Sequence, residues 1–208
     1  MITGITGTLA PAAPYATLRA GEMQNTVSPL KWMVEGLFIE AGAGILGGAP
    51  KTCKSFFGLD LCVAVASGTP CAGHFRVLAK GPVVLLCAED PHAVISSRLA
   101  SLAKGRSIHL ADLPIEIIVE SGVQLPLGLR RLEATLTRFE PRLLLLDPLI
   151  RLHRADENSA SEMSVILDGL RALARSSNTA ILLVHHARKA ASGNSGSGLR
   201  GSSDLHAF

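Results

Sequence analysis

Short runs rich in Leu, Ile and Val recur along the chain. Continuous apolar runs of this length are typical of strands that are buried on both faces of a parallel sheet. The runs lie at residues 83–87, 115–119, 143–146 and 180–184, and a further β-prone run covers 37–46 and ends in Gly47-Gly48.

Between these runs the apolar residues follow helical spacing. The segment 55–67 is apolar nearly all round, which is typical of a buried helix. Three further helical faces are carried by Ile95, Leu99 and Leu102, by Leu129, Leu132, Leu136 and Phe139, and by Met163, Ile166, Leu167, Leu170, Leu173 and Ala174.

Two of these helices have residues that are suited to their starts. Asp90 is a natural N-cap with Pro91 in the first helical position, so we expect Asp90 to be structural. Ser159 and Glu162 form a capping-box pattern ahead of the last helix.

Strands that alternate with helices predict an α/β fold with a mostly parallel central sheet and helices on both faces. In such sheets, ligands bind at the carboxyl ends of the strands. Residues 1–28 have no clear period, so we expect a loosely structured arm ahead of a core over 29–208. The Gly- and Ser-rich segment 187–203 is expected to be a mobile loop.

Composition changes this picture little. Apolar residues make up 48% and charged residues 18% of the 208 positions, which is ordinary for a soluble globular protein. A net charge of +3 permits a nucleic acid partner without requiring one. Because neither a signal-peptide pattern nor a membrane-spanning apolar stretch is present, we expect a cytoplasmic protein that does not contact a membrane.

The cysteines predict no metal centre. Because none of them forms a CxxC pair, a zinc site is not expected, and their scatter is typical of small hydrophobic residues in a reducing compartment. They are Cys53, Cys62, Cys71 and Cys87.

One segment is close to the pattern G-x-x-x-x-G-K-[ST]: Gly48-Ala49-Pro50-Lys51-Thr52-Cys53-Lys54-Ser55. A loop of this kind between a strand and a helix points backbone N–H groups inward and forms an anion-binding nest. Lys54 is placed to reach the β- and γ-phosphates of ATP, and the Ser55 hydroxyl to coordinate Mg²⁺. Cys53 departs from the pattern, because the usual Gly lets the backbone approach the phosphates without a Cβ.

Two acidic residues follow predicted strands. Asp147 comes directly after four leucines and is suited to hold the Mg²⁺ shell through water. A helix cap or loop Asp is the alternative. Glu89 ends the run that starts at Val83 and is suited to polarise the attacking water as general base, with a solvated turn acid as the alternative.

The last predicted strand ends at His185 and His186, one of which is suited to hydrogen-bond the γ-phosphate. The alternative is one packed and one solvated histidine. Arg188, Lys189 and Arg200 flank the Gly/Ser segment, which suits contact with a phosphate backbone or an arginine finger. A solvated charged face is the alternative for these cations.

Taken together, these residues resemble the RepA-type replicative helicases and the related RecA-like ATPases called AAA_25. The resemblance covers roughly residues 30–203. In chain order, its marks are Trp32 with Glu35-Gly36-Leu37, Gly48 to Ser55, Cys87-Ala-Glu-Asp-Pro91, Leu146-Asp147-Pro148-Leu149, Asp156-Glu157-Asn158, Val184-His185-His186 with Lys189, and Leu199-Arg-Gly-Ser-Ser203.

This resemblance implies a RecA-like core that assembles as a ring, often a hexamer, with ATP at the subunit interfaces. It implies that Glu89 activates water, that Asp147 serves the metal and that the histidine pair senses the γ-phosphate. It also implies that Arg200 reaches a neighbour's nucleotide and that the loop before it faces single-stranded DNA. Relatives usually continue further, so we expect a fragment or a core shortened at its C-terminal end.

Three functions fit these observations. The first is an ATP-driven motor on single-stranded DNA in the replication of a plasmid, phage or mobile element. The second is a nucleotide-binding switch that hydrolyses ATP poorly and regulates partner proteins, which Cys53 and the short C-terminus favour. The third is a recombinase-like filament former, which would share the same core.

Overall fold

The computed structural model describes residues 14–26 and 30–186, and the chain divides into two compact units between Leu30 and Lys31. The first unit contains helix α1 (Ala20–Thr26). This helix lies within residues 1–28, for which the sequence predicts a loosely structured arm. Its residues include good helix formers, and Glu22 in the first turn interacts favourably with the helix dipole.

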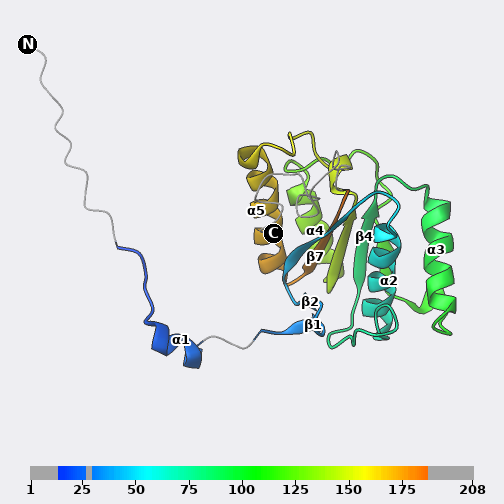
Figure 1. The fold of residues 1–208 in the computed structure, drawn as a ribbon, viewed down its shortest axis with the longest axis horizontal. Coiled ribbons are helices and arrows are strands. Elements are labelled where there is room, and N and C mark those ends of the chain that lie inside the picture. Colours follow the sequence, from blue (N-terminus) through cyan, green and yellow to red (C-terminus); the bar gives the residue numbers. More distant parts are fainter. Residues whose placement is uncertain (1–13, 27–29, 187–208) are drawn as a thin grey trace, which may run out of the picture. The chain divides into compact units, whose positions relative to one another are not determined.

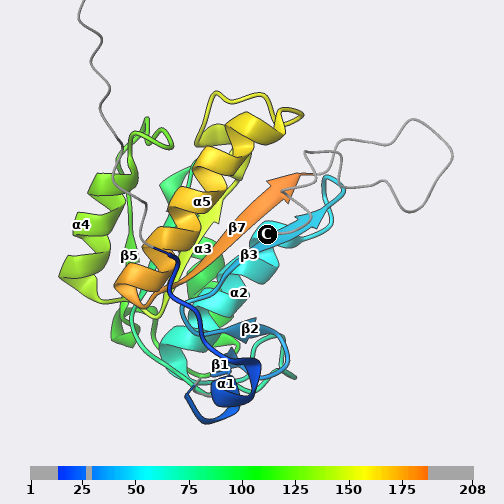
Figure 2. The ribbon, with the colours of Figure 1, turned by 90° about the vertical axis from the view of Figure 1, so that its left-hand side faces the viewer.

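In the second unit, five strands among the described residues form a parallel sheet in the order β3-β7-β6-β4-β5. β7 therefore lies between β3 and β6, and Figure 2 shows it running beside β3. A separate antiparallel pair joins β1 (Trp32–Val34) to β2 (Phe38–Ile39). The strands of the main sheet are β3 (Ala43–Gly48), β4 (Val83–Cys87), β5 (Ile115–Ile117), β6 (Leu143–Asp147) and β7 (Ala180–His186).

Helices cover both faces of this sheet (Figures 1 and 2). α2 and α3 pack on one face, and α4 and α5 pack on the other. Because side chains alternate across a strand, Leu143 and Leu145 join the α2 side of the core, whereas Leu144 and Leu146 join the α5 side. The predicted α/β architecture is confirmed. The helices are α2 (Lys54–Ser67), α3 (His92–Lys104), α4 (Leu129–Phe139) and α5 (Ala160–Ser177), with short 3-10 helices η1 (Leu110–Asp112) and η2 (Leu149–Arg151).

The start of α3 differs from the prediction. Pro91 is the N-cap, with an extended backbone, and the helix begins one residue later at His92. Asp90 therefore stands outside the helix and does not cap it. Its carboxylate instead forms a charge-assisted pair with Arg98, about two turns further along α3.

The predicted cap of α5 is confirmed. The Ser159 hydroxyl accepts a hydrogen bond from the Glu162 N–H at 3.4 Å. The Glu162 carboxylate accepts from the Asp156 N–H at 3.0 Å, one turn earlier than a capping box requires. This bond ties the turn before α5 to the first turn of the helix.

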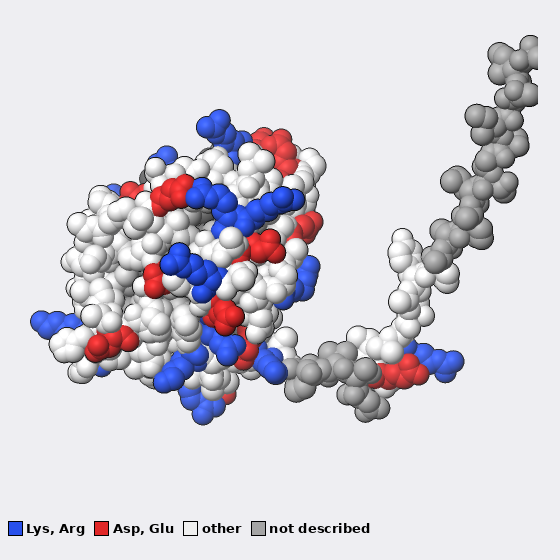
Figure 3. Space-filling model, turned by 180° about the vertical axis from the view of Figure 1, so that it is seen from behind, with Lys and Arg blue, Asp and Glu red and all other residues white. Residues whose placement is uncertain are grey.

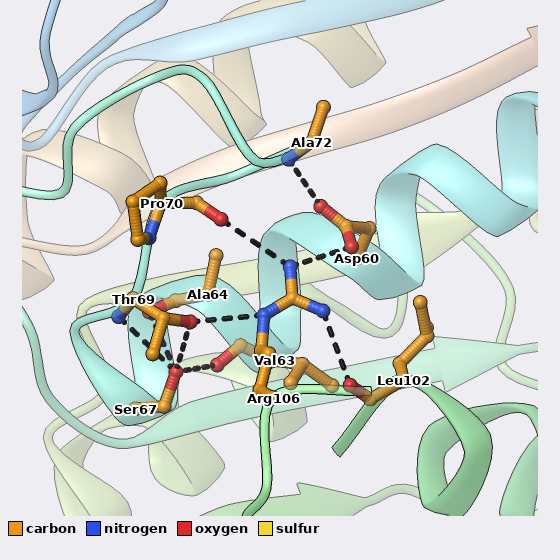
Figure 4. A network of polar contacts seen from close by, with 9 residues as sticks. All are labelled: Asp60, Val63, Ala64, Ser67, Thr69, Pro70, Ala72, Leu102 and Arg106. Carbon is orange, nitrogen blue, oxygen red and sulfur yellow. Dashed lines mark hydrogen bonds and ion pairs between the residues drawn. The ribbon is translucent and has the colours of Figure 1, made fainter. Parts of the chain in front are cut away.

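A buried ion pair joins α2 to the end of α3 (Figure 4). Arg106 Nη2 donates to Asp60 Oδ1 at 2.6 Å, and the two side chains are 14% and 13% exposed. Arg106 also donates to Thr69 Oγ1 at 2.9 Å and to the Leu102 carbonyl at 3.2 Å, while Asp60 accepts from the Ala72 N–H at 2.6 Å. We call this network the Asp60–Arg106 clamp. It holds α2, α3 and the loop that follows α2 in one arrangement.

The surface carries charges of both signs. On the face shown in Figure 3, the described Lys and Arg side chains are interspersed with Asp and Glu side chains and form no block of one sign. Exposed ion pairs contribute to this mixture, as between Arg131 and Glu120. Within the described segments, no helix is long and apolar enough to cross a membrane.

Candidate functional site

The loop that joins β3 to α2 is organised around Lys54. The Lys54 ammonium donates to the carbonyls of Gly48 at 2.8 Å and Ala49 at 2.6 Å, and it lies 3.5 Å from Thr52 Oγ1. The residue is only 6% exposed. A cation is therefore held inside the curve of the loop, where it can meet an anionic ligand.

Two residues of this loop have a left-handed backbone, Lys51 with φ 64° and Cys53 with φ 59°. Residues with a Cβ adopt this conformation only at a cost, whereas Gly adopts it freely. The preference for Gly at the position of Cys53 thus concerns the backbone dihedral as well as the space near the phosphates. Residues that alternate between right- and left-handed backbone conformations also form the nest of N–H groups that binds anions.

Helix α2 begins directly after this loop, with Cys53 as its N-cap. Cys53 contributes no side-chain cap bond to the described first turn. The first N–H groups of a helix have no intrahelical acceptor and carry the positive end of the helix dipole, so this end of α2 is suited to phosphate oxygens.

An open cavity of about 410 Å³ runs along the loop, and its size suits a nucleotide. It brings the loop together with Glu89 from the end of β4. Asp147 and His185 are not part of its lining. The lining residues are Lys51, Thr52, Cys53, Lys54, Ser55, Phe56, Glu89, Asp90 and Arg98.

Asp147 ends β6 and is 5% exposed. Strand alternation places it on the α2 face, like Leu145, and it is paired in register with Cys87 of β4. Burial and, after it, the charge of Asp147 raise the pKa of the Cys87 thiol to about 12. Asp147 also raises the pKa of buried Cys62 in α2, after the larger effects of burial and Cys87. The carboxylate therefore lies on the side of the sheet from which α2 starts.

Glu89 is held by a partner that the sequence analysis missed. Arg151 Nε donates to Glu89 Oε1 at 2.9 Å, and the two side chains are 64% and 41% exposed. Arg151 belongs to η2, which follows Asp147 at the same edge of the sheet. Arg151 lies shortly after Asp147 in the chain, and this proximity is the one feature of the sequence that indicates a role for Arg151 at this edge.

Two histidines, His185 and His186, end β7. His185 is buried on the α5 face, with its Nδ1 3.5 Å from Glu157 Oε1. The strand pairing sets His185 opposite Gly47 and His186 opposite Gly48, at the entrance of the loop. The His186 side chain, Arg188, Lys189, Arg200 and the segment 187–203 lie outside the described residues.

A comparison with family models identifies the class of protein. Residues 10–192 match the model of the AAA_25 family, which is described as an AAA domain. The chain belongs to this family. With its parallel sheet and the loop around Lys54, it is an AAA-family ATPase of the RecA-like kind, and the P-loop NTPase fold expected from the sequence is confirmed.

ATPases of the AAA kind generally bind ATP with Mg²⁺, and the residues present fit both. The Ser55 hydroxyl and the Asp147 carboxylate are oxygen ligands, which Mg²⁺ prefers. Among the described residues, no cluster of three or more His, Cys, Asp or Glu could hold a metal by itself. Mg²⁺ usually takes one or two protein ligands and completes its shell with water and nucleotide phosphates.

Proposed function

We propose that this chain is an ATP-driven motor of the RepA replicative-helicase type, acting on single-stranded DNA in the replication of a plasmid, phage or mobile element. The observation that carries the ATPase part is that the loop around Lys54 and the acid Glu89 border one nucleotide-sized cavity. The DNA part is supported by the ordered marks of resemblance from Trp32 to Ser203.

In this proposal different residues bind ATP and promote its hydrolysis. The backbone from Gly48 to Ser55 binds the ATP phosphates, and Lys54 stabilises the charge that develops on the γ-phosphate. Ser55 and Asp147 would hold Mg²⁺, which supplies charge neutralisation across the phosphates. Glu89 accepts the proton of the attacking water as general base.

The ion pair with Arg151 bears on the role of Glu89. The Arg151 guanidinium holds the Glu89 carboxylate at 2.9 Å, beside the cavity in which the attacking water would lie. It also competes with water for the same oxygen, because Oε1 accepts the Arg151 hydrogen bond. We therefore propose that Glu89 exchanges Arg151 for water when ATP is bound.

The remaining assignments concern assembly and DNA. We propose a ring, often a hexamer in this type of protein, in which Arg200 reaches the nucleotide of a neighbouring subunit. Arg188 and Lys189 would contact the DNA backbone. Arg200→Ala subunits keep an intact phosphate loop, and Lys54→Ala subunits keep an intact finger. A co-assembled mixture of the two should therefore recover part of the ATPase activity that each lacks alone.

The test of this function is steady-state ATP turnover with and without single-stranded DNA. We expect stimulation by single strands of any sequence, and an affinity for DNA that falls steeply with salt. Each phosphate contact should contribute a slope of roughly −0.7 in log K against log salt. Turnover that is indifferent to DNA, together with a salt-independent affinity, would remove DNA from the partner list.

A second candidate is a slow or non-hydrolysing switch that regulates partner proteins. Two observations favour it: the left-handed backbone of Cys53 and the engagement of Glu89 by Arg151. It predicts tight ATP binding with negligible turnover, whether or not DNA is present. The same turnover assay, run beside an equilibrium ATP-binding titration, separates the two candidates.

A further inference from the structure

Three ionisable side chains meet in the core on the α5 face of the sheet. Glu157 Oε1 lies 3.5 Å from His185 Nδ1 and 3.8 Å from His153 Nε2. The three side chains are 8%, 2% and 0% exposed, respectively. They come from the turn before α5, the end of β7 and the segment after η2. We call them the His153–Glu157–His185 cluster.

A polar cluster at this place is costly, and apolar residues could have filled it. Leu183 and Ile181, the preceding residues of β7 on the same face, are fully buried and apolar. A third apolar residue at the position of His185 would bury equally well. A carboxylate that lies 3.5 and 3.8 Å from two buried imidazoles instead favours the one arrangement that keeps these polar atoms together, because a buried polar group that loses its neighbour is costly.

The two imidazoles differ in their relation to Glu157. Burial lowers the pKa of His153, and the Glu157 carboxylate only partly opposes this effect. His153 therefore favours its neutral form. The His185 imidazole is the nearer of the two to the Glu157 carboxylate.

The cluster is connected to the phosphate loop through the strand pairing. His185 is paired in register with Gly47, and the next residue of β7 is paired with Gly48. The Gly48 carbonyl in turn accepts a hydrogen bond from Lys54. His185, the residue near Glu157, therefore comes directly before the β7 residue that pairs with Gly48 at the start of the phosphate loop.

We propose that Glu157 is a positioning residue for ATP hydrolysis: by holding His185, it fixes the end of β7 against the entrance of the phosphate loop. His153 Nε2 lies 3.8 Å from the same carboxylate oxygen and is the second neighbour that keeps Glu157 in place. This inference rests on the proposed ATPase function. It adds a function for the turn 156–158, which connects the nucleotide edge of the sheet to the start of α5.

The kinetic test uses Glu157→Gln, which keeps the side-chain volume and removes the charge. We expect kcat for ATP hydrolysis to fall about tenfold or more, with KM for ATP changing less than about threefold. Because Glu157 acts through His185, the double variant with His185→Gln should be no slower than the slower single variant. Glu133→Gln is the matched control, since it makes the same change on an exposed residue of α4 outside the cluster and should keep wild-type kcat.

The outcomes separate positioning from a merely structural role. A structural role lowers the midpoint of thermal unfolding but leaves kcat per active site unchanged, and that result overturns the inference. Independent, multiplicative losses in the double variant overturn the action through His185. Absence of ATP turnover in the wild-type protein overturns the proposed ATPase function itself, and is therefore distinguishable from both.

A measurement on the wild-type protein keeps the inference testable if Glu157→Gln does not fold. Addition of a non-hydrolysable ATP analogue should slow hydrogen exchange at the backbone amides of residues 154–158. Exchange at Lys104, at the far end of α3, should not change. Equal exchange at 154–158 with and without the bound analogue overturns the coupling.

Discussion

The Asp60–Arg106 clamp and the His153–Glu157–His185 cluster are both buried, but their contacts differ in length. The clamp joins Asp60 to Arg106 at 2.6 Å, and further donors and acceptors complete its bonds. In the cluster the separations are 3.5 and 3.8 Å, which exceed the length of an ordinary hydrogen bond. Burial of charge is therefore well compensated in the clamp and less closely compensated by the two imidazoles in the cluster.

The clamp and the cluster also differ in where they lie in the fold. The clamp joins the middle of α2 to the end of α3, away from the residues that line the nucleotide-sized cavity. The cluster lies at the carboxyl end of β7, where the sheet meets the phosphate loop. The comparison teaches that the close, saturated contacts of the clamp stabilise the fold away from the cavity, whereas the longer contacts of the cluster lie where they can position a strand end beside the phosphate loop. Changes at the clamp should therefore affect stability, and changes at the edge should affect ATP chemistry.

Lys54→Ala should give the largest effect, at the nucleotide edge. It should abolish ATP binding while the domain stays folded, because it removes a cation whose charge-assisted contacts contribute about 1.5–3 kcal/mol each. A titration with a fluorescent ATP analogue and a thermal unfolding curve provide the two readouts. Lys104→Ala, an exposed lysine in the last turn of α3, is the control. Nucleotide affinity within about twofold of wild type would contradict the site assignment.

Arg106→Ala should give the largest effect on stability. It leaves Asp60 buried without its guanidinium, and breaking a buried pair in this way costs about 3–5 kcal/mol. Urea unfolding measures the loss, and ATP turnover per folded molecule should not change. Arg76→Ala breaks the exposed pair with Glu35 and should cost less than about 1 kcal/mol. Similar losses in the two variants would remove the distinction between clamp and surface.

Glu89→Gln should lower kcat by about 10²-fold or more while ATP binding is retained, because this is the usual scale for the loss of a general base. Single-turnover hydrolysis and equilibrium binding are measured on the same preparation. The unfolding free energy should change little, since Glu89 forms an exposed ion pair with Arg151. Normal turnover would place the general base elsewhere, with Asp90 in the same cavity as the first alternative.

Cys53→Gly should give the smallest effect, a stabilisation of up to about 1 kcal/mol, because it relieves a left-handed backbone at a residue with a Cβ. ATP binding should tighten or hydrolysis should speed up. In the wild-type protein, alkylation of the exposed Cys53 thiol should inhibit turnover, and ATP should protect it. Identical kinetics in the two proteins would mean that the loop accommodates the side chain, and would weaken the switch hypothesis.

The elements that the sequence predicted well are those whose signal is local. The apolar runs at β4, β6 and β7 identify strands because helices cover both faces of the sheet. The phosphate loop is equally local, since one continuous segment supplies all its residues. By contrast, the start of α3 was wrong by one residue, because the partner of Asp90 is a side chain of the helix body that no capping rule considers.

Contacts between distant segments escaped prediction. Arg151 and Glu89 are 62 residues apart in the sequence, and only the neighbouring positions of β6 and β4 in the sheet bring them together. Glu157 and His185 meet in the same manner, because the turn before α5 passes over the end of β7. Residue types and spacing carry no information on which strand ends become neighbours.

The position of β7 sets the order in which a growing chain can acquire its parts. β3 is synthesised early, but its partner in the sheet is the last strand described, so Gly48 pairs with a residue from the other end of the core. Contacts between residues far apart in sequence form slowly, and domains emerge from the ribosome N-terminal end first. The strand that leads into the phosphate loop therefore gains this neighbour only after β4, β5 and β6 have been translated, and a nascent chain becomes able to hold nucleotide late.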